Sequence, residues 1–226
     1  MSTDATGLPS EGAAAVSRGL DVAATTAAGA GARSIRNLDD RLTLLLSRMT
    51  IASLSFFFAC FYFAQVYLQI VNENGMWLPA GITHPSTALG IAEVACIIVA
   101  GLAYFWGQWG GLYQRNYERL TAGLSLAALL SVAAVILHIG ELHNPGFYLK
   151  GGGYVSVFIA LEGTFTILLF ISTIVLLGMA NRARLGLFRQ SGIAVEAFGE
   201  YFGFLSAIAL MNFLALYVQP FFPSAG

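Results

Sequence analysis

Residues 154–180, YVSVFIALEGTFTILLFISTIVLLGMA, decide the fold class of this chain. The stretch is longer than the ~20 apolar residues that a helix needs to cross a bilayer. Its single acidic or basic side chain is Glu162. A charged group near the middle of a membrane helix costs roughly 2.5–3.5 kcal/mol on insertion scales. We therefore expect Glu162 to face other parts of the protein, with the remaining apolar segments arranged around it.

The composition agrees with a membrane protein. Of the 226 residues, 57% are hydrophobic and 10% are charged, whereas soluble domains carry about 25% charged residues. A soluble helical protein of this composition would leave most of its apolar surface in water. The two cysteines, Cys60 and Cys96, lie in apolar segments and form no CxxC motif, so we interpret them as small hydrophobic residues.

Four more segments have the length and composition of membrane spans. Lipid-exposed strands would leave their backbone groups unpaired, so these segments must be helices. The sequence therefore predicts an all-α integral membrane protein, with a five-helix transmembrane bundle over residues 41–226. The predicted spans are residues 49–71, 85–106, 120–142, 154–180 and 197–219.

Residues 1–40 differ from the rest of the chain. They are rich in Ala, Gly, Ser and Thr and lack the apolar core of a signal peptide. We expect a retained and mostly disordered cytoplasmic tail. The segment 41–48, RLTLLLSR, is typical of an interfacial lead-in whose arginines reach the headgroups.

The basic residues predict the orientation. All of them except Lys150 fall in the tail, the lead-in, or the second and fourth connections between spans. The positive-inside rule makes that side cytoplasmic. We expect a multi-pass protein of the cell inner (plasma) membrane, with its N-terminus inside and its C-terminus outside. The basic residues on the cytoplasmic side are Arg18, Arg33, Arg36, Arg41, Arg48, Arg115, Arg119, Arg182, Arg184 and Arg189.

Polar side chains occur at similar depths in several spans. Glu93 and Glu162 each lie eight residues from the expected outer end of their spans, about 12 Å below the surface at ~1.5 Å per residue. Gln65, His138 and Asn212 also fall in the outer half. One interpretation is a proton-conducting or metal-binding cluster. The other, which we favour, is hydrogen bonding between helices, worth ~1 kcal/mol or less per contact, with both acids uncharged because no basic residue lies in the spans to pair with them.

The pattern His138-Ile-Gly-Glu141-Leu-His143 is the most metal-like one in the chain. His138 and Glu141 share a helix face at the spacing that carboxylate-bridged metal sites use. Such sites need a second copy of the pattern, and His84 is the one other histidine. A membrane copper or iron enzyme using His138, Glu141 and His143, with Glu93 and Glu162, stays an alternative. The chain has no Walker A, GxGxxG, GxSxG or HExxH motif, and we expect no nucleic-acid partner.

Several motifs in order resemble subunit III of haem-copper respiratory oxidases (cytochrome c oxidase), in a divergent five-helix form. The segment 53–68, SLSFFFACFYFAQVYL, is similar to the family's aromatic helix, and Trp77-Leu78-Pro79 stands where the family has a W-P-P turn. His138-x-x-Glu141 takes the place of the family's Gln-x-x-Glu. Tyr154-Val155-Ser156-Val157-Phe158 resembles the opening Y-G-S-x-F, and Glu162-Gly163 aligns with its T-G. The last span resembles the family's final helix from Glu200-Tyr201 to Tyr217-Val218.

The resemblance implies a non-catalytic accessory subunit without a redox centre of its own. It would pack against the haem- and copper-bearing subunit I and other respiratory subunits, bind phospholipid, and keep proton uptake robust during electron transport. Carried-over structural, lipid-facing or interface positions are Glu141, Tyr154, Ser156, Gly163 and Tyr201. The family's acid in the first span is Leu54 here, which argues against a proton-antenna role, and Glu93 and Glu162 are additions to the family pattern. An accessory subunit of a nitric oxide reductase would have the same sequence features.

Overall fold

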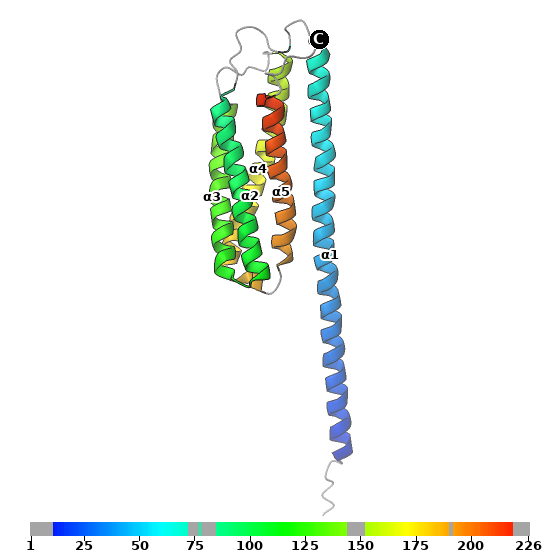
Figure 1. The fold of residues 1–226 in the computed structure, drawn as a ribbon. Helices are drawn as coiled ribbons and strands as arrows, with labels where there is room; N and C mark the ends of the chain where they lie inside the picture. The colour runs from blue at the N-terminus through cyan, green and yellow to red at the C-terminus, as the bar shows by residue number, and fades with distance from the viewer. Residues whose placement is uncertain (1–10, 72–76, 78–84, 144–151, 190–191, 219–226) are drawn as a thin grey trace, which may run out of the picture. The chain divides into compact units, whose positions relative to one another are not determined.

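The computed structural model describes residues 11–71, 77, 85–143, 152–189 and 192–218. In this part of the chain all regular structure is helical (Figure 1). Residues 72–76, 78–84 and 144–151, including His84 and Lys150, lie outside the described residues. The helices are α1 (Glu11–Val71), α2 (Thr87–Gln108), α3 (Tyr117–Leu142), α4 (Gly153–Arg184) and α5 (Ile193–Phe213), with the π-helical turns η1 (Trp109–Tyr113) and η3 (Leu214–Val218) and the short 3-10 helix η2 (Leu187–Arg189).

Five helices in the described residues are long and apolar enough to cross a membrane. This confirms the predicted fold class, and each helix coincides with one predicted span. The boundaries differ by a few residues because capping side chains decide where a helix begins. The Asn116 side chain accepts a hydrogen bond from the backbone N–H of Arg119 and so starts α3 at Tyr117, three residues before the predicted span. Ser86 likewise caps α2 through the N–H of Leu89.

The chain divides into two units, Met1–Thr43 and Leu44–Gly226. The first unit differs from the sequence-based expectation of a mostly disordered tail, because α1 begins at Glu11. Alanine has the highest intrinsic helix propensity, and residues 11–40 contain many alanines. A composition rich in Ala, Gly, Ser and Thr therefore suits a helical backbone as well as a disordered one.

The second unit is built around close contacts of α3 with α2 and α4. The tightest approach of α2 to α3 is at Gly107 and Gly123. A Cβ atom added to Gly123 would lie 2.5 Å from the Gly107 Cα and 2.7 Å from the Ala103 carbonyl oxygen. Small residues let membrane helices pack backbone to backbone. The buried face of α3 continues this pattern through Ala127, Ala128, Ser131 and Ala134, so the small residues of the third span serve packing within the chain.

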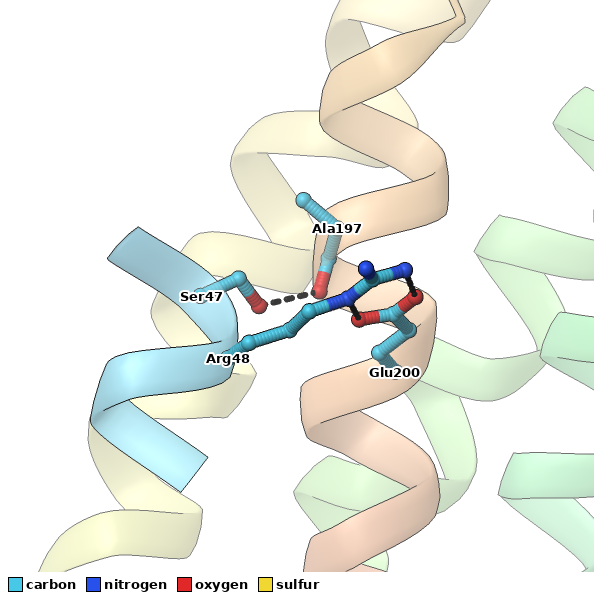
Figure 2. Close-up of polar contacts among 4 residues, drawn as sticks. All are labelled: Ser47, Arg48, Ala197 and Glu200. Atoms are coloured by element: carbon cyan, nitrogen blue, oxygen red, sulfur yellow. Dashed lines mark hydrogen bonds and ion pairs between the residues drawn. The ribbon is translucent and has the colours of Figure 1, made fainter. Parts of the chain in front are cut away.

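The membrane part of α1 is joined to α5 by polar contacts (Figure 2). The Ser47 hydroxyl donates to the Ala197 carbonyl oxygen at 2.8 Å. Arg48 forms a bidentate ion pair with Glu200, with Nη2–Oε1 at 2.8 Å and Nε–Oε2 at 3.0 Å. Further along the same two helices, the Tyr62 hydroxyl donates to Asn212 Oδ1 at 2.7 Å. Polar side chains therefore hold α1 against α5 at two levels.

Candidate functional site

Four ionisable side chains from three helices meet inside the bundle. His138 Nδ1 lies 3.4 Å from Glu93 Oε2 and 3.4 Å from Glu162 Oε2. Glu93 comes from α2, Glu162 from α4, and His138 from α3 between them. Glu141 follows His138 by one helical turn on the same face of α3, and its carboxyl group interacts with that of Glu93. We call these four residues the acid–histidine cluster.

The acid–histidine cluster is sealed from the surface of the described protein. The exposed fractions are 2% for Glu93, 4% for His138, 3% for Glu141 and 4% for Glu162. Glu93 lies about 9 Å and Glu162 about 14 Å along their helices from Thr87 and Gly153, at ~1.5 Å per residue. The structure thus brings together the two acids predicted to lie in the outer half of the spans, and it adds both members of the His138-x-x-Glu141 pattern.

Each of the three carboxyl groups in the cluster has one oxygen without a hydrogen-bond partner among the described residues. These buried atoms are Glu93 Oε1, Glu141 Oε1 and Glu162 Oε2. The buried Tyr217 hydroxyl, which lies next to Glu141, also has no hydrogen-bond partner among the described residues. Buried polar atoms in folded proteins are nearly always hydrogen-bonded to protein or to ordered water. The cluster therefore has hydrogen-bonding capacity beyond what its own side chains use.

Tyr217 is the member of this site that the sequence-based analysis missed. Its ring packs directly over Gly90, where an added Cβ would lie 2.8 Å from Cε1 and Cζ of the ring. Its hydroxyl is placed toward Glu141. The sequence placed Tyr217 near the end of the last span, where an aromatic side chain is readily interpreted as an interfacial anchor. A glycine one turn before Glu93 was the available signal, because it leaves room for a large ring from a neighbouring helix.

The end of α5 is a π-helical turn, η3, whose carbonyl groups accept hydrogen bonds from two other helices. Gln65 Nε2 of α1 donates to the Ala215 carbonyl oxygen at 2.7 Å. The Tyr154 hydroxyl of α4 donates to the Leu216 carbonyl oxygen at 2.8 Å. A π turn interrupts the regular i to i+4 ladder, so these side chains satisfy backbone groups of η3. Gln65 and Asn212 are both buried, and their side chains bind the Ala215 carbonyl oxygen and the Tyr62 hydroxyl.

Tyr154 also contacts the connection between α1 and α2. Its backbone N–H donates to the Trp77 carbonyl oxygen at 3.0 Å, and the two rings meet edge to face at 5.9 Å between centroids. Tyr154 is 1% exposed, so it is a buried structural residue at the start of α4. This arrangement links the two sequence motifs, Trp77-Leu78-Pro79 and Tyr154-Val155-Ser156, through a direct contact.

The remaining predicted site residues do not join the cluster. Ser156 is exposed and its hydroxyl donates to the Gly152 carbonyl oxygen of its own helix. Gly163 is half-buried, and a Cβ there would meet nothing within 4 Å. The hydroxyl of half-buried Tyr201 accepts a hydrogen bond from Ser172 at 3.3 Å. His143, the third residue of the metal-like pattern, is exposed at the C-cap of α3.

The metal alternative finds no support in the placement of donor side chains. Within the described ranges, no group of three or more His, Cys, Asp or Glu side chains is arranged to hold a metal ion. His143 is exposed at the C-cap of α3, whereas His138 and Glu141 are buried. The cluster's imidazole instead lies 3.4 Å from each of two carboxyl groups through one nitrogen, Nδ1.

The opposite end of the second unit is basic. Arg119 and Arg115 lie where α2 leads into α3, and Arg182 and Arg184 lie at the end of α4. The Arg119 guanidinium stacks over the Trp106 ring at 4.6 Å and donates to Gln114 Oε1 at 2.7 Å. The arginines and the acid–histidine cluster therefore lie at opposite ends of the same helices.

In the described part of the chain, five helices long and apolar enough to cross a membrane, a buried polar cluster at one end and arginines at the other define a polytopic helical membrane protein. The sequence profile of the family described as cytochrome c oxidase subunit III matches residues 26–220. This chain therefore belongs to the cytochrome c oxidase subunit III family, and it is a subunit III-like membrane component of the respiratory chain that associates with other oxidase subunits. A comparison with curated proteins finds no match.

Proposed function

We propose that this chain is a non-catalytic accessory subunit that packs against the haem- and copper-bearing subunit I of a respiratory oxidase. The observation that carries the proposal is the family match over residues 26–220, which spans α2 to α5 and most of α1. In this role the chain has no redox centre of its own, binds phospholipid, and supports proton uptake by subunit I through packing.

The exposed side chains of α1 support a role in packing. Phe56 and Phe63 are 78% and 75% exposed, and Met49 and Leu46 are exposed as well. The hydrophobic surface of a membrane helix faces lipid chains or another membrane subunit. We propose that phospholipid acyl chains and a neighbouring oxidase subunit cover this face of α1. Held to α5 by the contacts of Ser47, Arg48 and Tyr62, α1 offers its other sides to partners.

The distribution of arginines supports an orientation with the N-terminus in the cytoplasm and the C-terminus outside. Arg48, Arg119 and Arg184 lie at the end of the second unit opposite the acid–histidine cluster. Basic residues near the ends of spans stay on the cytoplasmic side. We therefore propose that the protein lies in the cell inner membrane with the cluster nearer the outer surface.

The proposal is tested by purifying the complex that contains this chain from its native membrane with a mild detergent. We expect a haem-bearing subunit to co-purify with it, together with phospholipid, while the isolated chain carries no stoichiometric metal. Copper or iron bound to the isolated chain, and lost in His138→Ala, would contradict the proposal. Co-purification with the subunits of a nitric oxide reductase would assign the chain to that complex instead.

A further inference from the structure

The acid–histidine cluster forms a continuous line of contacts from the end of the bundle toward its interior. Tyr217 lies in the terminal turn η3, and its hydroxyl is next to the carboxyl group of Glu141. Glu141 is one residue from the end of α3 and interacts with Glu93. Glu93 and then Glu162 each lie 3.4 Å from the same nitrogen of His138. Glu162 is the deepest of these groups along its helix.

The carboxyl groups of this line cannot all be ionised at once. The groups that face one another are Glu93 from α2, His138 and Glu141 from α3, Glu162 and Tyr154 from α4, Tyr217 from η3 and Tyr62 from α1. In the described residues no lysine or arginine faces the three carboxyl groups. Three like charges this close in a low-dielectric interior would repel one another strongly. The cluster therefore holds protons, and their number depends on how many the carboxyl groups and the imidazole share.

The buried polar atoms without a partner indicate what kind of ligand the cluster would bind. Glu93 Oε1, Glu141 Oε1, Glu162 Oε2 and the Tyr217 hydroxyl are buried without a hydrogen-bond partner among the described residues, and they belong to side chains that face one another. A buried water molecule typically makes about three hydrogen bonds to polar groups that protein atoms leave unsatisfied. Three acceptor oxygens and one hydroxyl group suit water that carries an excess proton better than they suit an apolar ligand.

We propose that Tyr217, Glu141, Glu93, His138 and Glu162 form a proton-binding line that binds hydrated protons at the end of the bundle and passes them inward to Glu162. A proton from water is taken up by the carboxylate of Glu141 and passes to Glu93. His138 Nδ1, which faces both Glu93 and Glu162, takes that proton and releases it to Glu162 when Glu162 has given up its own proton and is a carboxylate. Only O–H and N–H bonds form and break, no electrons move, and the line gains one proton for each one that leaves the water.

Infrared spectroscopy of the purified complex, with its lipids, tests the proposal. The carbonyl stretching band of each protonated carboxyl group shifts when its proton exchanges for deuterium. The variants Glu93→Gln, Glu141→Gln and Glu162→Gln assign the bands by loss, and Glu118→Gln, which changes an exposed acid at the other end of α3, is the matched control. We expect the wild-type bands to exchange after transfer to D₂O and to change with pH, and Glu118→Gln to leave them unchanged.

The decisive result is how each variant changes the exchange rates of the other carboxyl groups, because the proposed proton line runs in one order. In Glu141→Gln the Glu93 and Glu162 bands exchange at least about tenfold more slowly, which corresponds to about 1.4 kcal/mol of added barrier. In His138→Asn the Glu162 band alone exchanges more slowly. In Glu162→Gln the Glu93 and Glu141 bands keep their wild-type rates. If Glu141→Gln does not assemble, Tyr217→Phe replaces it and keeps the ring over Gly90. Because Tyr217 stands at the start of the line, this variant slows the deuterium exchange of all three carboxyl groups.

Any of three results would overturn the proposal. Carboxyl bands that neither exchange nor change with pH in the wild-type complex would show that the cluster only cross-links the helices. Equal exchange rates for all three groups in every variant would exclude an ordered line. A stoichiometric metal ion lost together with the bands in His138→Asn would show that the ligand is a metal ion and not a proton.

Discussion

The guanidinium of Arg48 in α1 and the carboxylate of Glu200 in α5 form two parallel hydrogen bonds, at 2.8 Å and 3.0 Å (Figure 2). Bidentate pairs of this kind fix the relative orientation of two elements as well as adding energy. The side chains are 63% and 32% exposed, and exposed ion pairs contribute about 0–1 kcal/mol in water. The main effect of the pair is therefore to set the register of α1 along α5.

A double-mutant cycle measures this coupling. We expect Arg48→Gln and Glu200→Gln each to lower the thermal stability of the detergent-solubilised protein slightly, and the double variant to lose less stability than the sum of the two single variants. Arg182→Gln combined with Glu200→Gln is the control and should be additive, because the carboxylate of Glu200 pairs with Arg48. Additive losses in the Arg48 cycle would contradict a direct contribution of the pair.

Substitutions of Glu162 test whether the cluster tolerates loss of this carboxyl group but not the introduction of a charge. We expect Glu162→Gln to assemble in wild-type amounts, because an amide keeps the volume of an uncharged carboxyl group. Glu162→Lys should abolish assembly, since it adds a charge at a depth where insertion costs roughly 2.5–3.5 kcal/mol. Blue-native electrophoresis of membranes measures the assembled complex, and Glu118→Lys at an exposed position is the control. Severe loss of the complex in Glu162→Gln would argue against an uncharged Glu162.

Because Gly107 and Gly123 are in contact, the effect of a glycine substitution on stability should depend strongly on its position along α3. Gly123→Ala places a methyl group 2.5 Å from the Gly107 Cα, and overpacking of this kind typically costs 1–3 kcal/mol. Gly140→Ala on the same helix meets nothing within 4 Å and should leave stability unchanged or slightly improved. Thermal unfolding followed by circular dichroism compares the two variants. Equal stability of both would mean that α2 and α3 are not in backbone contact.

The two ends of α3 offer a direct test of the proposed orientation. Glu118 and His143 are both exposed and lie at opposite ends of this helix. In a background in which Cys60 and Cys96 are replaced by Ala, we expect His143→Cys to react with a membrane-impermeant maleimide in intact cells. Glu118→Cys should react only after the membrane is opened. The reverse pattern of labelling would place the N-terminus outside.

The sequence was sufficient for the spans because each one exceeds the thickness of a bilayer and the basic residues mark one side. The same reasoning placed Glu93, Glu162 and His138 at similar depths, since depth follows from counting residues along a helix. Rotation around the helix axis does not follow from counting. The meeting of His138 with both acids depends on how α3 packs between α2 and α4, and that packing is set by Gly107, Gly123 and the small residues around them.

The helical turn at the end of α5 escaped prediction for a related reason. A π turn contains one residue more than an α turn, and nothing in the hydropathy of residues 214–218 distinguishes the two. The contribution of Tyr217 to the site was missed together with it. For residues 11–40 the composition suits both a disordered segment and an alanine-rich helix, and here they form the first part of α1.

The extra residue of η3 has a consequence for relatives of this chain. In an α-helix each residue turns the chain by about 100°, so deleting one residue between 214 and 218 would rotate Tyr217 away from Glu141 and withdraw the carbonyl acceptors of Gln65 and Tyr154. The hydrophobic character of the last span would hardly change. An alignment would record a single-residue gap near the C-terminus, yet that gap would separate homologues that keep the buried acids connected to the bundle end from those that have lost the connection.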